Sequence, residues 1–316
     1  MRLDSRSGGG RVVVGGAINT DLVGWTDRYP QRGETVTGTG FAVFGGGKGG
    51  NQAVAAARSD AKVAIIGGVG EDAFGRERLA DLVAEGIATS GVQRFRHASS
   101  GVALIAIEDG DNRILYVPGA TLLVDADHAV GALGDEPISV LLVTLELERP
   151  VLDGLIARTR RDGGIVVLNA TPEPERAASL LPAVDILIVN EGEALALLGR
   201  EPADQEDWPA VAAGLRKRGA SAVLVTLGAN GALWVDEAGS QSFPAPAVDV
   251  VDTTGAGDSL CGAVAAAVAR GSPATEAVRL GVAAGSLACA VAGAQPSIPT
   301  LAAIEQLLSA SKRVPE

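Results

Sequence analysis

The chain has 316 residues, 47% of them hydrophobic and 20% charged, which is enough apolar material for a sizeable core. Its 26 Lys and Arg against 38 Asp and Glu give a formal charge of −12, which argues against a nucleic-acid or basic membrane-surface protein. Two cysteines and two histidines exclude a disulfide framework, a Cys/His zinc site and a histidine-centred mechanism. No apolar run reaches the ~18 residues of a membrane span. We therefore expect a cytoplasmic protein with no membrane or nucleic-acid partner.

Apolar, β-branched runs alternate along the chain with Ala- and Leu-rich stretches that have helical spacing. The expected strands are residues 12–14, 63–66, 102–107, 138–143, 165–168, 186–189, 222–225 and 232–235. The expected helices are residues 51–58, 74–85, 151–161, 208–218, 258–270 and 274–290. Most strand runs are continuously apolar, as in parallel strands buried on both faces. The alternation predicts a doubly wound α/β structure with a mainly parallel central sheet.

Three segments lie outside this alternation. Residues 1–10 carry no hydrophobic signal core and are expected to form a flexible tail, which leaves residues 11–316 as a single domain. Residues 22–44 are polar and β-prone, and residues 98–118 contain a hairpin signal around Glu108-Asp-Gly-Asp-Asn112. We expect these two segments to form one small sheet beside the main domain, either as a lid over a site or as ordinary surface hairpins.

A glycine-rich stretch, Phe44-Gly-Gly-Gly-Lys-Gly-Gly-Asn51, precedes the first long expected helix. It satisfies the GxGxxG dinucleotide pattern, but a polar turn segment precedes it where a buried strand is required. It is not a Walker A loop either, because Gly49 follows Lys48 where Ser or Thr is needed. Its backbone N–H groups, Lys48 and the Asn51 amide are suited to a polar ligand, and a simple turn is the alternative.

A second motif, Asp252-Thr-Thr-Gly-Ala-Gly-Asp258, leads into another expected helix. The free N–H groups at a helix start favour an anion, and Gly255 and Gly257 leave space for a ligand to approach the backbone. Asp258 lies next to them as a candidate base, or else as an ordinary helix-start carboxylate. An anion-stabilising turn beside a carboxylate base suits phosphoryl transfer to a hydroxyl group.

Three polar clusters follow other expected strands. Asn190 and Glu193 are placed to orient phosphates or to hold Mg²⁺ through water, and are equally explicable as a helix cap. The turn at residues 226–231 either cradles a nucleotide or connects two strands. Asn19 and Asp21 suit bidentate recognition of vicinal hydroxyls, with an Asx-turn as the alternative.

From residue 12 to about residue 299, these motifs in this order resemble the ribokinase-like carbohydrate kinase family, also called the phosphofructokinase-B superfamily. The resemblance rests on four segments, namely Gly45-Gly-Gly-Lys-Gly-Gly-Asn-Gln-Ala53, Asp252-Thr-Thr-Gly-Ala-Gly-Asp258, Pro30-Gln-Arg-Gly-Glu-Thr-Val-Thr37 and Gly293-Ala-Gln-Pro-Ser297. The resemblance implies a three-layer α/β/α domain with a small β-sheet lid that also forms a homodimer interface. It further implies ATP-dependent phosphorylation of D-ribose at the 5-hydroxyl, with Mg²⁺ and a monovalent cation, usually K⁺.

Roles follow from the resemblance residue by residue. Asp258 becomes the catalytic base, and the anion hole consists of Gly255, Ala256 and Gly257. The sugar-binding positions are Asn19, Asp21, Gly47, Lys48, Asn51, Glu146 and Asp258. The nucleotide positions are Asn190, Glu193, Thr226, Leu227, Gly228, Ala229, Asn230, Gly231 and Gly257. The monovalent-cation positions are Asp252, Thr254, Ala288, Val291, Gly293 and Ser297.

The chain departs from the family pattern at four places. The early signature has an extra glycine within residues 45–47, and Leu145-Glu-Leu-Glu-Arg-Pro150 is longer than usual, which makes Glu148 a possible substitute for Glu146. Thr121 stands where Asn is common, and Val282 where a polar residue often lines the adenine pocket. The acceptor therefore stays open between D-ribose and 2-deoxyribose, another pentose, fructose or a nucleoside. A non-catalytic sugar- or nucleotide-binding protein is the remaining hypothesis.

Overall fold

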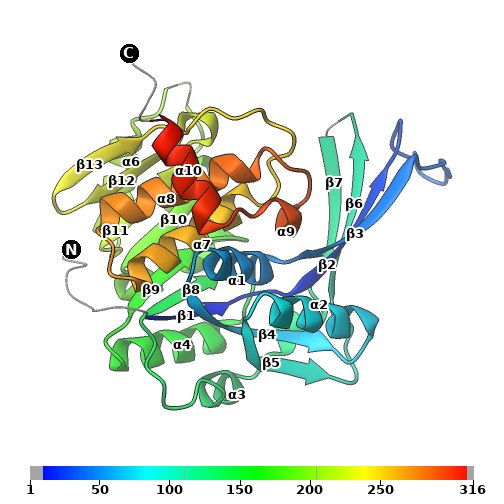
Figure 1. Ribbon diagram of the computed structural model, residues 1–316, viewed down its shortest axis with the longest axis horizontal. Coiled ribbons are helices and arrows are strands. Elements are labelled where there is room, and N and C mark those ends of the chain that lie inside the picture. Colours follow the sequence, from blue (N-terminus) through cyan, green and yellow to red (C-terminus); the bar gives the residue numbers. More distant parts are fainter. Residues whose placement is uncertain (1–9, 110, 204, 312–316) are drawn as a thin grey trace.

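A computed structural model describes residues 10–109, 111–203 and 205–311. Within these residues, nine strands form one sheet in the order β13-β12-β11-β10-β9-β8-β1-β4-β5 (Figure 1). Their bounds are β1 Arg11–Gly15, β4 Lys62–Gly70, β5 Ala88–Phe95, β8 Val140–Thr144, β9 Ile165–Asn169, β10 Ile186–Asn190, β11 Ala222–Thr226, β12 Ala232–Asp236 and β13 Gly239–Phe243. Neighbours from β11 to β5 pair in parallel, and β12 and β13 add an antiparallel edge. The expected parallel sheet is confirmed.

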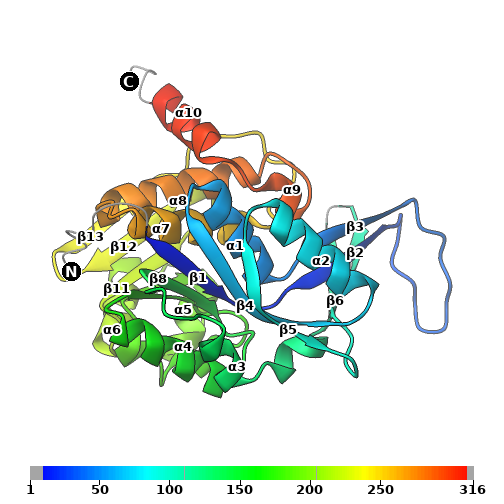
Figure 2. The same cartoon turned by 60° about the horizontal axis from the view of Figure 1, so that its bottom comes forward.

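Helices cover both faces of this sheet, which gives the three layers visible in Figure 2. One face carries α1 Lys48–Arg58, α2 Ala73–Ala84, α7 Ala256–Ala269, α8 Ala274–Ala288 and α10 Leu301–Ser311. The other carries α3 Ala126–Gly131, α4 Arg149–Arg161, α5 Glu191–Leu198 and α6 Trp208–Lys217. Along β1, Val12 and Val14 are buried in the first core and Val13 in the second, because side chains alternate across a strand. The continuous apolar run is thus explained by burial on both faces.

A separate four-stranded sheet lies beside the main domain in the order β3-β2-β6-β7 (Figure 1). Its strands are β2 Asn19–Trp25, β3 Gly40–Gly46, β6 Gly101–Glu108 and β7 Asp111–Val117. The small sheet is confirmed, but it begins at Asn19 instead of residue 22, and residues 26–39 form a loop between β2 and β3. Asn19 and Asp21 therefore come after β1 of the main sheet, as expected, but they lie at the start of a strand of the small sheet.

Several elements differ from expectation for physical reasons. The strands β5 and β13 were not expected, since their sequences ATSGVQRF and GSQSF are half polar, as suits the two edges of the sheet. Helix α1 begins at Lys48 and includes Gly49 and Gly50, so packing overrides the low helix propensity of glycine there. Of the expected tail, residues 1–9 lie outside the described residues. In the part of the chain that the structure describes, no helix is long and apolar enough to cross a membrane.

Candidate active site

The N-terminal ends of α1 and α7 meet above the sheet, and this meeting places the two glycine motifs side by side. The helices approach closely because Gly262 of α7 faces α1. A Cβ atom at position 262 would lie 2.4 Å from Cβ of Ala55 and 2.6 Å from the carbonyl oxygen of Gln52. At the start of α1, a Cβ atom on Gly49 would lie 2.4 Å from the backbone of Gly16. Close packing therefore requires glycine at position 49 of the early motif and at position 262, one turn after the late motif.

Asp258 projects from the first turn of α7 toward α1. Its Oδ2 accepts a hydrogen bond of 2.9 Å from Nδ2 of Asn51, and its Oδ1 accepts one of 2.9 Å from Nε2 of Gln52. The helix N-cap is Gly255, and no side chain caps the helix. Asp258 is also 8% exposed. The carboxylate is therefore held by another helix within the site, and does not serve as a cap.

The residues expected to form an anion hole lie at the start of α7. Gly255 has φ +81°, and a Cβ atom there would lie 3.1 Å from Cα of Ala294. A Cβ atom on Gly257 would meet nothing within 4 Å. Both glycines line a cavity of about 230 Å³, with Ala256 between them in the chain. Because N–H groups in the first turn of a helix have no partner within that helix, this end of the cavity suits an anion.

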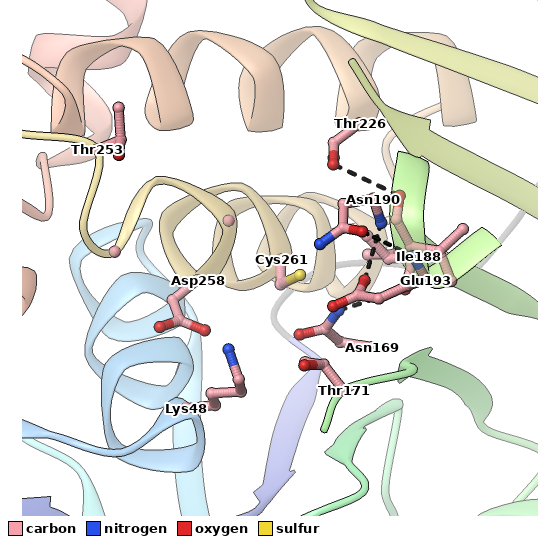
Figure 3. A pocket seen from close by; sticks show the side chains of 13 residues that line it. Lys48, Asn169, Thr171, Ile188, Asn190, Glu193, Thr226, Thr253, Asp258 and Cys261 are labelled. Atoms are coloured by element: carbon pink, nitrogen blue, oxygen red, sulfur yellow. Dashed lines mark hydrogen bonds between the residues drawn. The ribbon is translucent and has the colours of Figure 1, made fainter. Parts of the chain in front are cut away.

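Figure 3 shows that the side chain of Lys48 points into the same cavity toward Asp258. Burial alone would lower the pKa of Lys48, but the carboxylates of Asp258, Glu146 and Glu193 outweigh it and raise that pKa. Lys48 therefore stays protonated. It supplies the positive charge that a phosphoryl group needs in a chain of net negative charge.

Glu146 lies inside the site. Its Oε2 accepts hydrogen bonds from the backbone N–H of Ala17 (2.8 Å) and from the Thr144 hydroxyl (2.9 Å). The N–H groups of Lys48 and Gly49 also donate to this carboxylate, each at 3.3 Å. Burial raises the pKa of Glu146, while these donors and the charge of Lys48 oppose the rise. The carboxylate thus anchors the start of α1.

Glu148 occupies a different environment. It is the N-cap residue of α4, and its half-exposed side chain lies 4.0 Å from the guanidinium of Arg176. Of the two glutamates that the sequence left open, the structure brings Glu146 into the site and leaves Glu148 outside it.

Asp21 and Asn19 face the site from β2. A Cβ atom on Gly46 would lie 2.2 Å from Oδ1 of Asp21, so glycine is required opposite this carboxylate. Burial and the nearby carboxylates of Asp258 and Glu146 raise the pKa of Asp21 to about 6. Asn19 is 4% exposed, and its Oδ1 accepts no hydrogen bond from the residues that the structure describes. A hydroxyl donor from a ligand would satisfy that buried oxygen.

Gly47 joins the small sheet to α1. It is the N-cap of that helix with φ +80°, and a Cβ atom there would lie 2.5 Å from the carbonyl oxygen of Ala17. Its backbone therefore lies beside Asp21 and Lys48, where the resemblance expects a sugar.

The far wall of the cavity contains Asn190 and Glu193. They form a reciprocal capping box at the start of α5. The Glu193 N–H donates to Oδ1 of Asn190, and the Asn190 N–H donates to Oε2 of Glu193, both at 2.8 Å. The helix-cap interpretation is confirmed, and both side chains also line the cavity (Figure 3), so their role toward phosphates or Mg²⁺ stays a prediction.

Thr226 lines the same wall, and its hydroxyl lies 3.4 Å from the carbonyl oxygen of Val189. The rest of the expected nucleotide turn, residues 227–231, connects β11 to β12 and does not line this cavity. Gly231 has φ +86°, and a Cβ atom there would lie 1.9 Å from the carbonyl oxygen of Phe243, which explains that glycine by packing.

The positions expected for a monovalent cation come from two loops that meet beside α7. Oδ2 of Asp252 accepts a hydrogen bond of 2.8 Å from the Gly293 N–H, and its Oδ1 accepts from the backbone N–H and the hydroxyl of Thr254. The Ser297 hydroxyl lies 3.5 Å from the carbonyl oxygen of Thr254, and Ala288 ends α8 just before Val291. The donors here are carbonyl oxygens and one carboxylate. Among the described residues, no three His, Cys, Asp or Glu are grouped to hold a metal, and the monovalent-cation site stays a prediction.

Five residues in or beside the site were not expected from the sequence. Gln52 contacts Asp258, Asn169 and Thr171 line the cavity at and just after the end of β9, and Cys261 of α7 lines it as well. Tyr116 also lies on the face of the small sheet that carries Asp21, since Asp21 pairs with Ala103 and Ala103 with Tyr116. Burial, with the Glu146 carboxylate, raises the pKa of Tyr116 to about 12, while polar groups of Asn19 and Thr121 oppose the rise. The one sequence signal for these residues was the position of Gln52, which directly follows Asn51 in the early signature.

Comparison with known proteins agrees with this geometry. Residues 10–301 match the model of the pfkB family carbohydrate kinases. The chain is 36% identical over 307 residues to a ribokinase of Schizosaccharomyces pombe, with 93% of this chain and 96% of the relative covered. It is 32% identical to a deoxyribokinase of Salmonella typhi, with 94% and 98% covered.

Among solved structures, a ribokinase of Arabidopsis thaliana complexed with ribose and ATP superposes with a TM-score of 0.85. It is 30% identical, with 95% of this chain and 99% of that chain covered. The family model spans nearly the whole chain, and these relatives align with 93–95% of the chain. The chain belongs to the pfkB family of carbohydrate kinases.

Proposed function

We propose that this kinase transfers the γ-phosphoryl group of ATP to the 5-hydroxyl of D-ribose. The observation that carries the proposal is the buried carboxylate of Asp258, which lies between the sugar-type residues of α1 and β2 and the open backbone at Gly257. A ribokinase relative and a ribokinase structure with ribose and ATP support this acceptor.

In the proposed reaction, Asp258 accepts the proton of the sugar hydroxyl as its oxygen attacks the γ-phosphorus. The new O–P bond forms while the bond to the bridging oxygen of ADP breaks, so ADP leaves with that electron pair. The N–H groups of Gly255 and Gly257 would stabilise the negative charge on the transferring group, together with that of Ala256, which also donates to the Thr253 carbonyl oxygen at 3.3 Å. Lys48 adds a fixed positive charge on the same side of the cavity.

The sugar would be held by carboxylate and amide groups that no protein donor satisfies. The Oδ1 atoms of Asn19 and Asn51 are buried without a donor among the described residues, and Asp21 lies beside Gly46 with both oxygens close by. Vicinal hydroxyls would supply the missing donors. A sugar that lacks one hydroxyl would leave a buried acceptor unpaired.

Mg²⁺ and K⁺ belong to this proposal. Mg²⁺ would reach the phosphates near Asn190 and Glu193, through water, and would neutralise charge on the nucleotide. The oxygen donors around Asp252, Thr254 and Gly293 would hold K⁺ beside the anion hole and so support its backbone geometry. An ATP-consuming sugar kinase of this kind is expected in the cytoplasm.

We further propose that the small sheet closes over the sugar as a lid and forms a homodimer interface. Residues 22–44 and 98–118 would make this lid on a single kinase domain of residues 11–316. The face opposite Asp21 carries exposed apolar residues, namely Phe41, Val43, Leu104, Leu115 and Val117. Apolar surface of this extent favours a partner, and a second copy fits an isologous pairing. Closure would exclude the water that competes with the sugar.

The second candidate acceptor is 2-deoxyribose, because a deoxyribokinase is 32% identical over nearly the same length. A panel of D-ribose, 2-deoxyribose, fructose and a nucleoside, each with ATP and Mg²⁺ and with or without K⁺, distinguishes them by the initial rate of ADP release. We expect the highest kcat/KM with D-ribose and stimulation by K⁺. A higher kcat/KM with 2-deoxyribose would overturn the first acceptor, and no ADP release with any sugar would overturn the kinase activity.

A further inference from the structure

Gln52 is fully buried between the candidate base and the strand that borders the nucleotide half of the cavity. Its Nε2 donates to Oδ1 of Asp258 and to Oδ1 of Asn169, both at 2.9 Å. Asn169 ends β9 and lines the cavity. One amide group therefore contacts both α7 and the central sheet.

The direction of these hydrogen bonds follows from the network. Nδ2 of Asn169 donates to the carbonyl oxygen of Ile188, which accepts only, so Oδ1 of Asn169 is the atom that faces Gln52. The NH₂ group of Gln52 must then face Asn169, and it also meets the carboxylate of Asp258. The Oε1 atom of Gln52 is buried and has no partner among the described residues. The fold thus leaves Oε1 of Gln52 unsatisfied, while its side-chain NH₂ group donates to Oδ1 of Asp258 and to Oδ1 of Asn169.

We propose that Gln52 is a positioning residue for Asp258, and that Asn169 holds Gln52 in the orientation this requires. The inference rests on the proposed phosphoryl transfer, in which Asp258 is the base. A donor on Oδ1 fixes the rotation of the carboxylate, so that Oδ2 is the oxygen presented beside Asn51, where the sugar hydroxyl would bind.

The other ionisable groups near Asp258 include both a cation and carboxylates. Lys48 of α1 is the nearby cation, whereas Asp21 of β2 and Glu146 after β8 are carboxylates, and Cys261 of α7 is a buried thiol. All four remain in place when Gln52 alone is changed. A loss of turnover in Gln52→Met can therefore be assigned to the lost donor.

The test compares kcat and KM of Gln52→Met and Gln52→Glu with those of the unaltered protein, with D-ribose and ATP. Methionine has nearly the same length without a donor, and glutamate keeps the shape but faces Asp258 with a like charge. We expect kcat to fall about 10- to 100-fold with the KM for ATP unchanged, as expected for a misplaced catalytic group. We also expect calorimetry to detect D-ribose binding to both variants, because Asn19, Asp21 and Asn51 are unchanged.

Two comparisons separate positioning from general destabilisation. Val54→Ala truncates a buried core side chain of the same helix, so it should lower Tm without the loss of kcat expected for the Gln52 variants. Asn169→Ala should lower kcat in the unaltered protein but not further in the Gln52→Met background, because it acts through Gln52.

A kcat that falls in the Gln52 variants only as far as in Val54→Ala would overturn this inference, as would an Asn169→Ala effect that adds in full to that of Gln52→Met. An unaltered protein that phosphorylates no sugar would overturn the proposed function as well, so the two failures are distinguishable.

Discussion

The side-chain amide of Asn51 donates a hydrogen bond of 2.9 Å to Oδ2 of Asp258, although 207 positions separate them in the sequence. This contact joins the early glycine motif to the late one. It also places the base against the helix end expected to bind the sugar.

Glu146 is expected to contribute to stability as well as to sugar binding. Glu146→Ala would leave the N–H groups of Ala17 and Gly49 and the Thr144 hydroxyl without their acceptor. We expect the free energy of unfolding to fall by about 2–4 kcal/mol, because buried donors would lose a charged partner. Glu148→Ala is the matched control, since its side chain is half-exposed, and it should change stability by less than about 0.5 kcal/mol. Urea unfolding of both variants measures this, and equal losses would contradict the assignment of Glu146 as the anchor.

The two glycines of the anion hole are expected to respond differently to alanine. Gly257→Ala meets nothing within 4 Å, so the fold should tolerate it, while its new methyl group would occupy space needed by the phosphoryl group. Gly255→Ala forces a left-handed conformation, at φ +81°, and should cost about 1–2 kcal/mol of stability.

Thermal unfolding and kcat measured together distinguish these effects. We expect Gly257→Ala to keep the Tm of the unaltered protein while losing most of its kcat, and Gly255→Ala to lose both. If Gly257→Ala retained full turnover, the cavity beside this glycine would not be the phosphoryl site.

Sugar affinity should depend on pH through Asp21. Burial, together with the charges of Asp258 and Glu146, raises its pKa to about 6 from 3.8. The folded chain therefore favours the neutral form, so this stabilisation is complete below pH 3.8 and is lost as the pH rises through about 6. The ionised form accepts sugar hydroxyls, so affinity for D-ribose should rise over the same interval. Calorimetric titrations at pH 5, 6 and 7 measure it, and the slope should vanish in Asp21→Asn. A slope that persists in that variant would assign the titration to another group.

The exposed apolar face of the small sheet predicts dimerisation. Leu115 is 61% exposed on that face, and Leu115→Lys should give a monomer in sedimentation velocity at micromolar concentration. Val83→Lys on α2 is the control, because Val83 is 60% exposed but lies outside the small sheet. A monomeric unaltered protein, or a dimeric Leu115→Lys protein, would contradict this interface.

Much of this arrangement could be predicted from the sequence, because it depends on local patterns. Continuous apolar runs indicated the parallel strands, and glycines before helical spacing indicated the starts of α1 and α7. The contact of Gln52 with Asn169 joins residues 117 positions apart, and no local pattern predicts such a pair. Residues 227–231 have the composition of a turn that binds a nucleotide. Whether such a turn lines the cavity depends on how β12 packs, and no local pattern predicts that.

The central claim is that Asp258 activates a sugar hydroxyl for phosphoryl transfer, and Asp258→Asn tests it most directly. Asparagine keeps the shape and removes the base, so kcat should fall by about 10³-fold, while calorimetry still detects D-ribose binding. Asp249→Asn, at an exposed aspartate of the preceding loop, is the control and should keep normal turnover. The product is followed by ³¹P NMR of ATP with D-ribose. We predict a 5-phosphate signal from the unaltered protein that is nearly absent with Asp258→Asn. Equal product from both proteins, or phosphate on another hydroxyl, would contradict the account.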